Sequence, residues 1–258
     1  MNKKLTRGKG STKIKAIGMG LIYKDYIEEK EVWIVNASTD SHFHSQRDNQ
    51  KLPHETCNVT SMVMALIQAG YLPEVRDRVP ERYLSKQNGI VDYLITRFLT
   101  PEMFKRMEEV VGKGTNWKPF NIHRILTEGI NEFFGTKDTS LFYTKWNIQK
   151  VLFRILEGGG AVLSGTFDLS GGRELGHMVS LAGFVTAQSN IAFVTREEDI
   201  DVNQITAFII DDPYGDYYTD YADHRGNDIE MKADDFFRIM RPVGEKETIW
   251  AHLIKVKN

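Results

Sequence analysis

The spacing of apolar and polar positions divides the chain into a mostly helical first part and a β-rich second part. From Cys57 onward apolar residues recur at helical spacing, and Gly70 supplies a stop, so the pattern predicts a helix that begins at or just before Cys57. The apolar positions of this helix are Met62, Val63, Leu66 and Ala69. Residues from about 72 to 157 continue as short helical pieces separated by prolines, with core-facing stripes at 94–99 and 148–155.

The period then changes from helical to strand-like. Runs rich in β-branched and aromatic residues predict strands at 31–36, 161–167, 178–186, 206–211 and 250–256, and residues 189–203 are expected to form an exposed loop. Helices followed by strands in one chain favour an α+β class, with the helical first part packed on an antiparallel sheet. We expect a single domain over 1–258 with a helical insertion at about 72–157.

Length and charge narrow the classes of protein. The chain has 258 residues, enough for one large or two small domains, and Lys+Arg 33 against Asp+Glu 35 gives a net charge of -2, so nucleic acid is not an expected partner. No apolar run approaches about 18 residues, which predicts no transmembrane segment. The basic residues Lys3, Lys4, Arg7 and Lys9 precede an apolar run at 16–23, but its two glycines and the absence of a small-residue cleavage pattern predict a protein made in the cytoplasm without a signal peptide.

Cys57 is the single cysteine, so it forms no intrachain disulfide. Unpaired backbone N–H groups and the positive end of the dipole at a helix N-terminus both stabilise a thiolate, which is a nucleophile. A free cysteine is also one of the most frequently buried residue types, so Cys57 taken alone is better explained as a small core residue.

Two further segments carry groups that complement a thiol. His177 lies at the start of a predicted strand, and imidazole is the usual base partner at neutral pH. Asp212 lies at the end of another strand, where a carboxylate can accept the second imidazole N–H and fix its tautomer. Asp211 competes for this role because one residue along a strand reverses the face, and Asp212-Pro213 alone is ordinary turn chemistry.

Taken together, the motifs resemble those of C39-like cysteine peptidases of papain-like fold. They are Gln46-x-x-Asn49, Cys57-x-x-Thr60-Ser61-x-x-Met64, Gly176-His177-x-Val179 and Asp212-Pro213-Tyr214-Gly215. The resemblance implies a nucleophilic Cys57, a general base and acid at His177, and an orienting Asp212. It also implies that Gln46 and the Cys57 backbone N–H form the oxyanion hole. The family usually has glycine after the nucleophile, where this chain has Asn58.

Within that family the likeness is greatest to phage endolysins, including those associated with oral spirochaetes. It implies a peptidoglycan amidohydrolase that forms a thioester, needs no cofactor and acts on the cell wall after synthesis in the cytoplasm. An intracellular cysteine peptidase acting on proteins is the alternative enzyme, and a non-catalytic metal-binding or wall-binding module is the alternative outside enzymes. The scissile bond and the oligomeric state are not readable from the sequence.

Two metal sites are also compatible with the residue types. Asp216, Asp220 and Asp223 supply the oxygen ligands that Ca²⁺ prefers, although without the spacing of an EF-hand. A zinc site would use the ligand types found in His42, His44, His54 and Cys57. The zinc interpretation leaves His177 and Asp212 unexplained, so the hydrolase is the favoured hypothesis.

Overall fold

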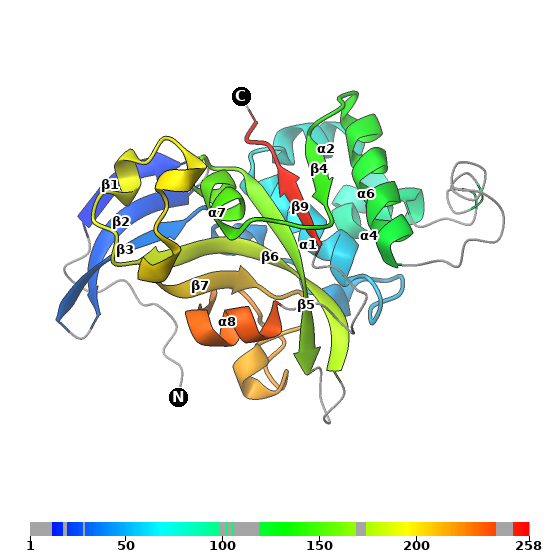
Figure 1. Ribbon diagram of the computed structural model, residues 1–258. Helices are drawn as coiled ribbons and strands as arrows, with labels where there is room; N and C mark the ends of the chain where they lie inside the picture. The colour runs from blue at the N-terminus through cyan, green and yellow to red at the C-terminus, as the bar shows by residue number, and fades with distance from the viewer. Residues whose placement is uncertain are drawn as a thin grey trace.

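A computed structural model describes residues 12–17, 20–27, 29–98, 102, 105, 119–168, 174–240 and 250–257. The basic residues Lys3, Lys4, Arg7 and Lys9 and the stripe residue Leu99 lie outside the described residues. Within the described residues the chain is α+β, with seven α-helices and a large antiparallel sheet (Figure 1). The predicted α+β class is therefore confirmed.

In the part of the chain that the structure describes, the sheet has nine strands, and every neighbouring pair is antiparallel. Its main path runs β1-β2-β3-β6-β5-β9-β4, with β7 paired to β6 and β8 paired to β7. The strands are β1 (Thr12–Ile17), β2 (Gly20–Ile27), β3 (Lys30–Asn36), β4 (Ser140–Tyr143), β5 (Gly160–Asp168), β6 (Glu174–Thr186), β7 (Ile205–Asp211), β8 (Ile229–Lys232) and β9 (Ala251–Ile254).

Strand β6 is the centre of this sheet because it pairs with three others. Its residues 174–181 pair with β5, its residues 183–186 pair with β3, and β7 pairs along both stretches. At residues 180–181, β6 pairs with β5 on one edge and with β7 on the other. At residues 183–186 it pairs with β3 and β7, so β5 and β3 lie along the same edge of β6 and β7 lies along the opposite edge. His177 is in the first part of β6, where the strand pairs with β5.

The helices gather mainly toward the β9 and β4 end of the sheet. In Figure 1, α1, α2, α4 and α6 lie together there, while β1 to β3 lie at the opposite end. The α-helices are α1 (Cys57–Gln68), α2 (Leu72–Arg78), α3 (Glu81–Leu84), α4 (Gly89–Phe98), α6 (Pro119–Phe134), α7 (Ile148–Leu156) and α8 (Ala233–Ile239). None of the helices in the described part of the chain is both long and apolar enough to cross a bilayer.

Helix α1 is buried between these helices and the sheet. It ends at Gln68, and Gly70, the predicted stop, follows two residues later with a φ of +92°, a conformation that favours glycine. Gln68 at its last turn donates to the carbonyls of Gly159 and Leu181 at 3.0 and 3.2 Å. A side chain at Gly160 would lie 2.4 Å from the Ala65 carbonyl oxygen, so glycine there allows α1 to lie directly on β5.

Some expectations need correction. The strands predicted at 31–36, 161–167, 178–186, 206–211 and 250–256 are present as β3, β5, β6, β7 and β9. The first part is not only helical, because the apolar run at 16–23 spans parts of β1 and β2, and the middle also contributes β4. The loop at 189–203 is only partly exposed, because Ile191 and Ile200 are buried in the main core. Strand β8 and helix α8 were not predicted.

Candidate active site

Cys57 is the first residue of α1 and its side chain is half-buried. The residue before it, Thr56, makes no side-chain cap, so no capping hydroxyl lies between the sulfur and the positive end of the helix dipole. The Thr56 hydroxyl instead donates to the Leu52 carbonyl at 3.0 Å and accepts from the Asn49 amide at 2.9 Å. The chain that leads into α1 is thereby fixed while the thiol remains accessible.

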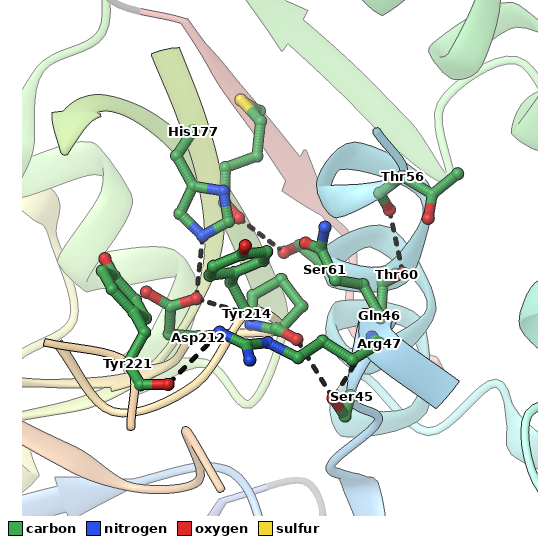
Figure 2. Close-up of polar contacts among 12 residues, drawn as sticks. Ser45, Gln46, Arg47, Thr56, Thr60, Ser61, His177, Asp212, Tyr214 and Tyr221 are labelled. Atoms are coloured by element: carbon green, nitrogen blue, oxygen red, sulfur yellow. Dashed lines mark hydrogen bonds and ion pairs between the residues drawn. The ribbon is translucent and has the colours of Figure 1, made fainter. Parts of the chain in front are cut away.

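His177 and Asp212 form a buried pair. The His177 Nε2 atom donates to the Asp212 Oδ1 atom at 2.8 Å, and both side chains are almost fully buried (Figure 2). Asp212 is the first residue after β7, and the same oxygen also accepts the Tyr214 backbone N–H at 2.8 Å. Because Nε2 is bound to the carboxylate, Nδ1 is the ring atom available to a thiol.

The electrostatics of His177 involve both partners. Burial alone lowers the pKa of the imidazole, but interactions with Asp212 and with Cys57 outweigh this effect and raise the pKa of His177 to about 10. A group whose pKa lies that far above neutrality carries its proton at pH 7. The structure thus brings Cys57, His177 and Asp212 together, with the imidazole between the thiol and the carboxylate.

Asp211 faces elsewhere. Its Oδ1 atom accepts the Asp228 backbone N–H at 2.8 Å, and in the sheet it lies opposite Ser180. Asp212, rather than Asp211, is therefore the carboxylate that contacts His177. The chain changes from strand to turn between these two residues, so strand alternation could not distinguish them.

Gln46 lies in the short 3₁₀ turn η2 (Gln46–Asp48) and is fully buried. Its backbone N–H donates to the Pro213 carbonyl at 2.8 Å, which joins the glutamine loop to the residue after Asp212. Its side-chain Nε2 atom donates to the Pro53 carbonyl at 2.9 Å. A primary amide has two N–H groups, so one remains for a substrate oxygen.

A network of buried amides holds the glutamine loop against α1. Asn49 donates to the hydroxyls of Thr56 and Thr60 at 2.9 and 3.0 Å. Asn88, the residue immediately before α4, donates to the Ser45 carbonyl at 2.6 Å and to the Asn49 side-chain oxygen at 2.9 Å. Helix α4 therefore positions Gln46 indirectly, which gives the helical middle a structural role at the site.

Aromatic rings enclose the imidazole, which the sequence did not predict. Phe167 on β5 meets His177 edge-on at 5.1 Å between ring centroids, and Tyr214 lies at 6.3 Å. Tyr221 is buried beside Asp212, and burial together with that carboxylate raises the pKa of its phenol far above the ordinary value. Tyr214, two positions after Asp212, is the one sequence signal that could have indicated this enclosure.

The acidic loop after Tyr214 is occupied by other contacts. Asp216 accepts the Tyr218 backbone N–H at 2.9 Å, Asp223 pairs with Arg225 at 2.9 Å, and Asp220 ends the 3₁₀ turn η6 (Tyr217–Thr219) with a φ of +51°. Among the described residues no group of three or more His, Cys, Asp or Glu side chains could hold a metal ion. A Ca²⁺ site at these three aspartates remains a prediction, and it would require Asp223 to exchange Arg225 for the cation.

The histidines considered for zinc also have other surroundings. The ring of His42 accepts the Thr39 backbone N–H at 3.0 Å, and the His44 ring contacts the Asn88 side-chain oxygen at 3.0 Å. His54 is exposed.

Asn58 occupies the position where the resembled family has glycine. Its side-chain oxygen accepts the backbone N–H of the next residue, Val59, at 2.8 Å.

A pocket of about 350 Å³ lies away from Cys57, His177 and Asp212. Its walls include Ser41 and His44, Ile67 near the end of α1, Leu72 in α2 and Ile90 in α4. Cys57 begins α1 and Ile67 is at its far end, so this pocket is not the place where the thiol, imidazole and carboxylate meet.

Comparison with known proteins finds no relative: neither protein-family models nor curated proteins match the sequence.

Proposed function

We propose that this protein is a cysteine hydrolase of papain-like fold that cleaves amide bonds, with peptidoglycan as the preferred substrate. The observation that carries the proposal is the buried imidazole of His177, bound to Asp212 at 2.8 Å and interacting with Cys57 at the start of α1. A structural cysteine needs neither a buried protonated imidazole nor a carboxylate behind it. The choice of peptidoglycan rests on the resemblance of the motifs to phage endolysins.

In the first half of the reaction the Cys57 thiolate attacks the amide carbonyl carbon, and a C–S bond forms. The carbonyl oxygen becomes an oxyanion, which in this scheme accepts hydrogen bonds from the second side-chain N–H of Gln46 and from the Cys57 backbone N–H. The C–N bond then breaks as the His177 imidazolium gives its proton to the leaving nitrogen. An amine departs and a thioester remains on Cys57.

In the second half a water molecule attacks the thioester carbonyl. His177, now neutral, accepts a proton from that water, the C–S bond breaks, and the carboxylic acid leaves. The sulfur departs as thiolate and the imidazolium is restored. Asp212 accepts the Nε2–H throughout and keeps the ring in the orientation that presents Nδ1 to the sulfur.

The papain-like fold is part of the proposal and is supported by the arrangement of the elements. The helix that begins with the nucleophile lies on an antiparallel sheet, one strand of that sheet carries the histidine, and the turn after the next strand carries the orienting side chain. The order of these residues in the chain, Gln46, Cys57, His177 and Asp212, also agrees with the resemblance.

Digestion of purified peptidoglycan tests the activity and its chemistry. Clearing of a suspension, with new amino groups and no new reducing sugars among the released fragments, is the expected result for amide cleavage. The Cys57→Ser variant and protein alkylated with iodoacetamide are the matched controls, since Cys57 is the only cysteine and both remove one sulfur nucleophile. New reducing ends, or clearing that survives both controls, would contradict the proposal, while cleavage of casein but not of peptidoglycan would indicate the protein peptidase.

A further inference from the structure

Arg47 directly follows Gln46, and its side chain runs along the enclosure of the proposed active site. Its guanidinium carbon lies 4.1 Å from the centroid of the Tyr214 ring, and the Tyr214 ring is in turn 6.3 Å from the His177 ring. Figure 2 shows the Arg47 side chain passing Tyr214 toward Asp212 and Tyr221. A cation is thus held one aromatic ring away from the imidazole.

The charge of Arg47 has no acidic partner among the described residues. One terminal nitrogen contacts the His224 Nε2 atom at 2.5 Å, the other donates to the Tyr221 carbonyl at 3.2 Å, and the buried Nε–H has no partner within the described chain. The carboxylates near this part of the chain are engaged, Asp212 by His177 and Asp223 by Arg225. A half-buried guanidinium with spare N–H groups and an unpaired charge is suited to bind a carboxylate.

The proposed reaction indicates which part of the substrate would reach this cation. His177 must deliver its proton to the leaving nitrogen, so the departing amine lies on the imidazole side of the sulfur. Tyr214 flanks that ring and Arg47 covers Tyr214. A group attached to the leaving nitrogen can therefore extend along the tyrosine toward the guanidinium.

We infer that Arg47 binds a carboxylate on the leaving-group side of the scissile bond, so that the preferred substrates are peptides whose amine product is acidic. This inference rests on the proposed cysteine hydrolase and specifies its substrate class. Arg47 acts here as a specificity residue that contacts the departing fragment and not the reacting atoms.

Two synthetic peptides test this, both built around the bond identified by mass analysis of the peptidoglycan digest. They share the acyl part and differ only in whether the leaving fragment ends in a free carboxylate or in a carboxamide. We expect the wild-type protein to prefer the carboxylate by about 10- to 100-fold in kcat/KM, the range of a charge-assisted hydrogen bond. Arg47→Gln should remove that preference mainly through KM and leave the carboxamide peptide within about twofold, whereas Arg47→Lys should retain part of it.

Arg196→Gln is the matched control, because Arg196 pairs with Asp199 on a different loop; the change removes one positive charge without freeing a carboxylate beside Arg47, and it should keep the preference. Equal cleavage of the two peptides by the wild type would overturn the inference while leaving the hydrolase intact, and this comparison does not depend on any variant folding. An equal loss on both peptides in Arg47→Gln would show that Arg47 only holds its loop. Cleavage that persists in Cys57→Ser would instead refute the proposed function and the inference with it.

Discussion

Replacing Asp212 with asparagine isolates the contribution of one buried charge to the state of His177. Asparagine has nearly the same shape and can still accept the Nε2–H of His177 and the Tyr214 backbone N–H through its oxygen. What disappears is the negative charge that opposes the effect of burial on the imidazole. The variant should therefore fold with the ring in place but with a weaker hold on its proton.

The expected change in the pKa of His177 follows from the distance between the centres of the two charges, which is somewhat longer than the 2.8 Å between the contacting atoms. Two unit charges about 4 Å apart interact by about 4 kcal/mol at an effective dielectric constant of about 20, and a change of about 1.4 kcal/mol shifts a pKa by one. Loss of the Asp212 charge should therefore lower the pKa of His177 by about 3, from about 10 to about 7. Near neutral pH the variant would lose much of its imidazolium, and with it the positive charge beside Cys57.

Two measurements check this expectation without a known substrate. NMR titration of the imidazole resonances, with His177 assigned by its absence in His177→Gln, reports the pKa directly. The pH dependence of iodoacetamide alkylation reports the reactivity of Cys57. Asp211→Asn is the matched control, because that carboxylate binds the Asp228 backbone, and it should leave the His177 titration unchanged. If His177 titrates at the same pH in Asp212→Asn and in the wild type, the charge of Asp212 does not raise the pKa of His177, and the expectation is refuted.

Three further perturbations test other parts of the structure. Cys57→Ser should abolish alkylation and lower turnover by at least about 10³-fold while the melting temperature stays within a few degrees, because the side chain is only half-buried. Asn88→Ala should lower the free energy of unfolding in urea by about 1–3 kcal/mol and also slow alkylation, because its bond to the Ser45 carbonyl holds the glutamine loop. His123 is buried against His252 at 3.0 Å and burial lowers its pKa to about 4, so the unfolded state binds more protons below pH 6.5. From pH 6.5 down to about 4 the wild type should therefore lose about 3 kcal/mol more stability than His123→Leu, measured by denaturant unfolding at each pH.

The parts of the site that the sequence predicted are those determined by local signals. Gly70 and the apolar spacing after Cys57 define the helix, so the position of the thiol at its N-terminus follows from nearby residues. The strand containing His177 and the turn at Asp212-Pro213 have equally local signals. In each case the residue type and its secondary structure are set within about ten residues, which is the range over which sequence patterns are informative.

What the sequence did not predict depends on contacts between distant segments. Strands β1 and β2 were not predicted, and the sequence showed only an apolar run at 16–23. Their pairing depends on β3 and includes an irregularity in β1, so it is not visible in the alternation of their own residues. Strand β4 has only four residues and forms by pairing with β9, more than a hundred residues away. The role of Asn88 is invisible in the same way, since it acts on a loop 39 to 43 residues earlier in the chain.

The enclosure of His177 shows why such long-range contacts matter for the proposed chemistry. The imidazole and the Asp212 carboxylate attract each other strongly only because water is excluded from them, and the residues that exclude it come from β5, at Phe167, and from the turn after β7, at Tyr214. The same burial would remove the proton from His177 if the carboxylate were absent. The aromatic rings and Asp212 therefore act as one unit: the rings make the charge of the carboxylate effective, and the carboxylate makes burial compatible with a protonated imidazole beside Cys57.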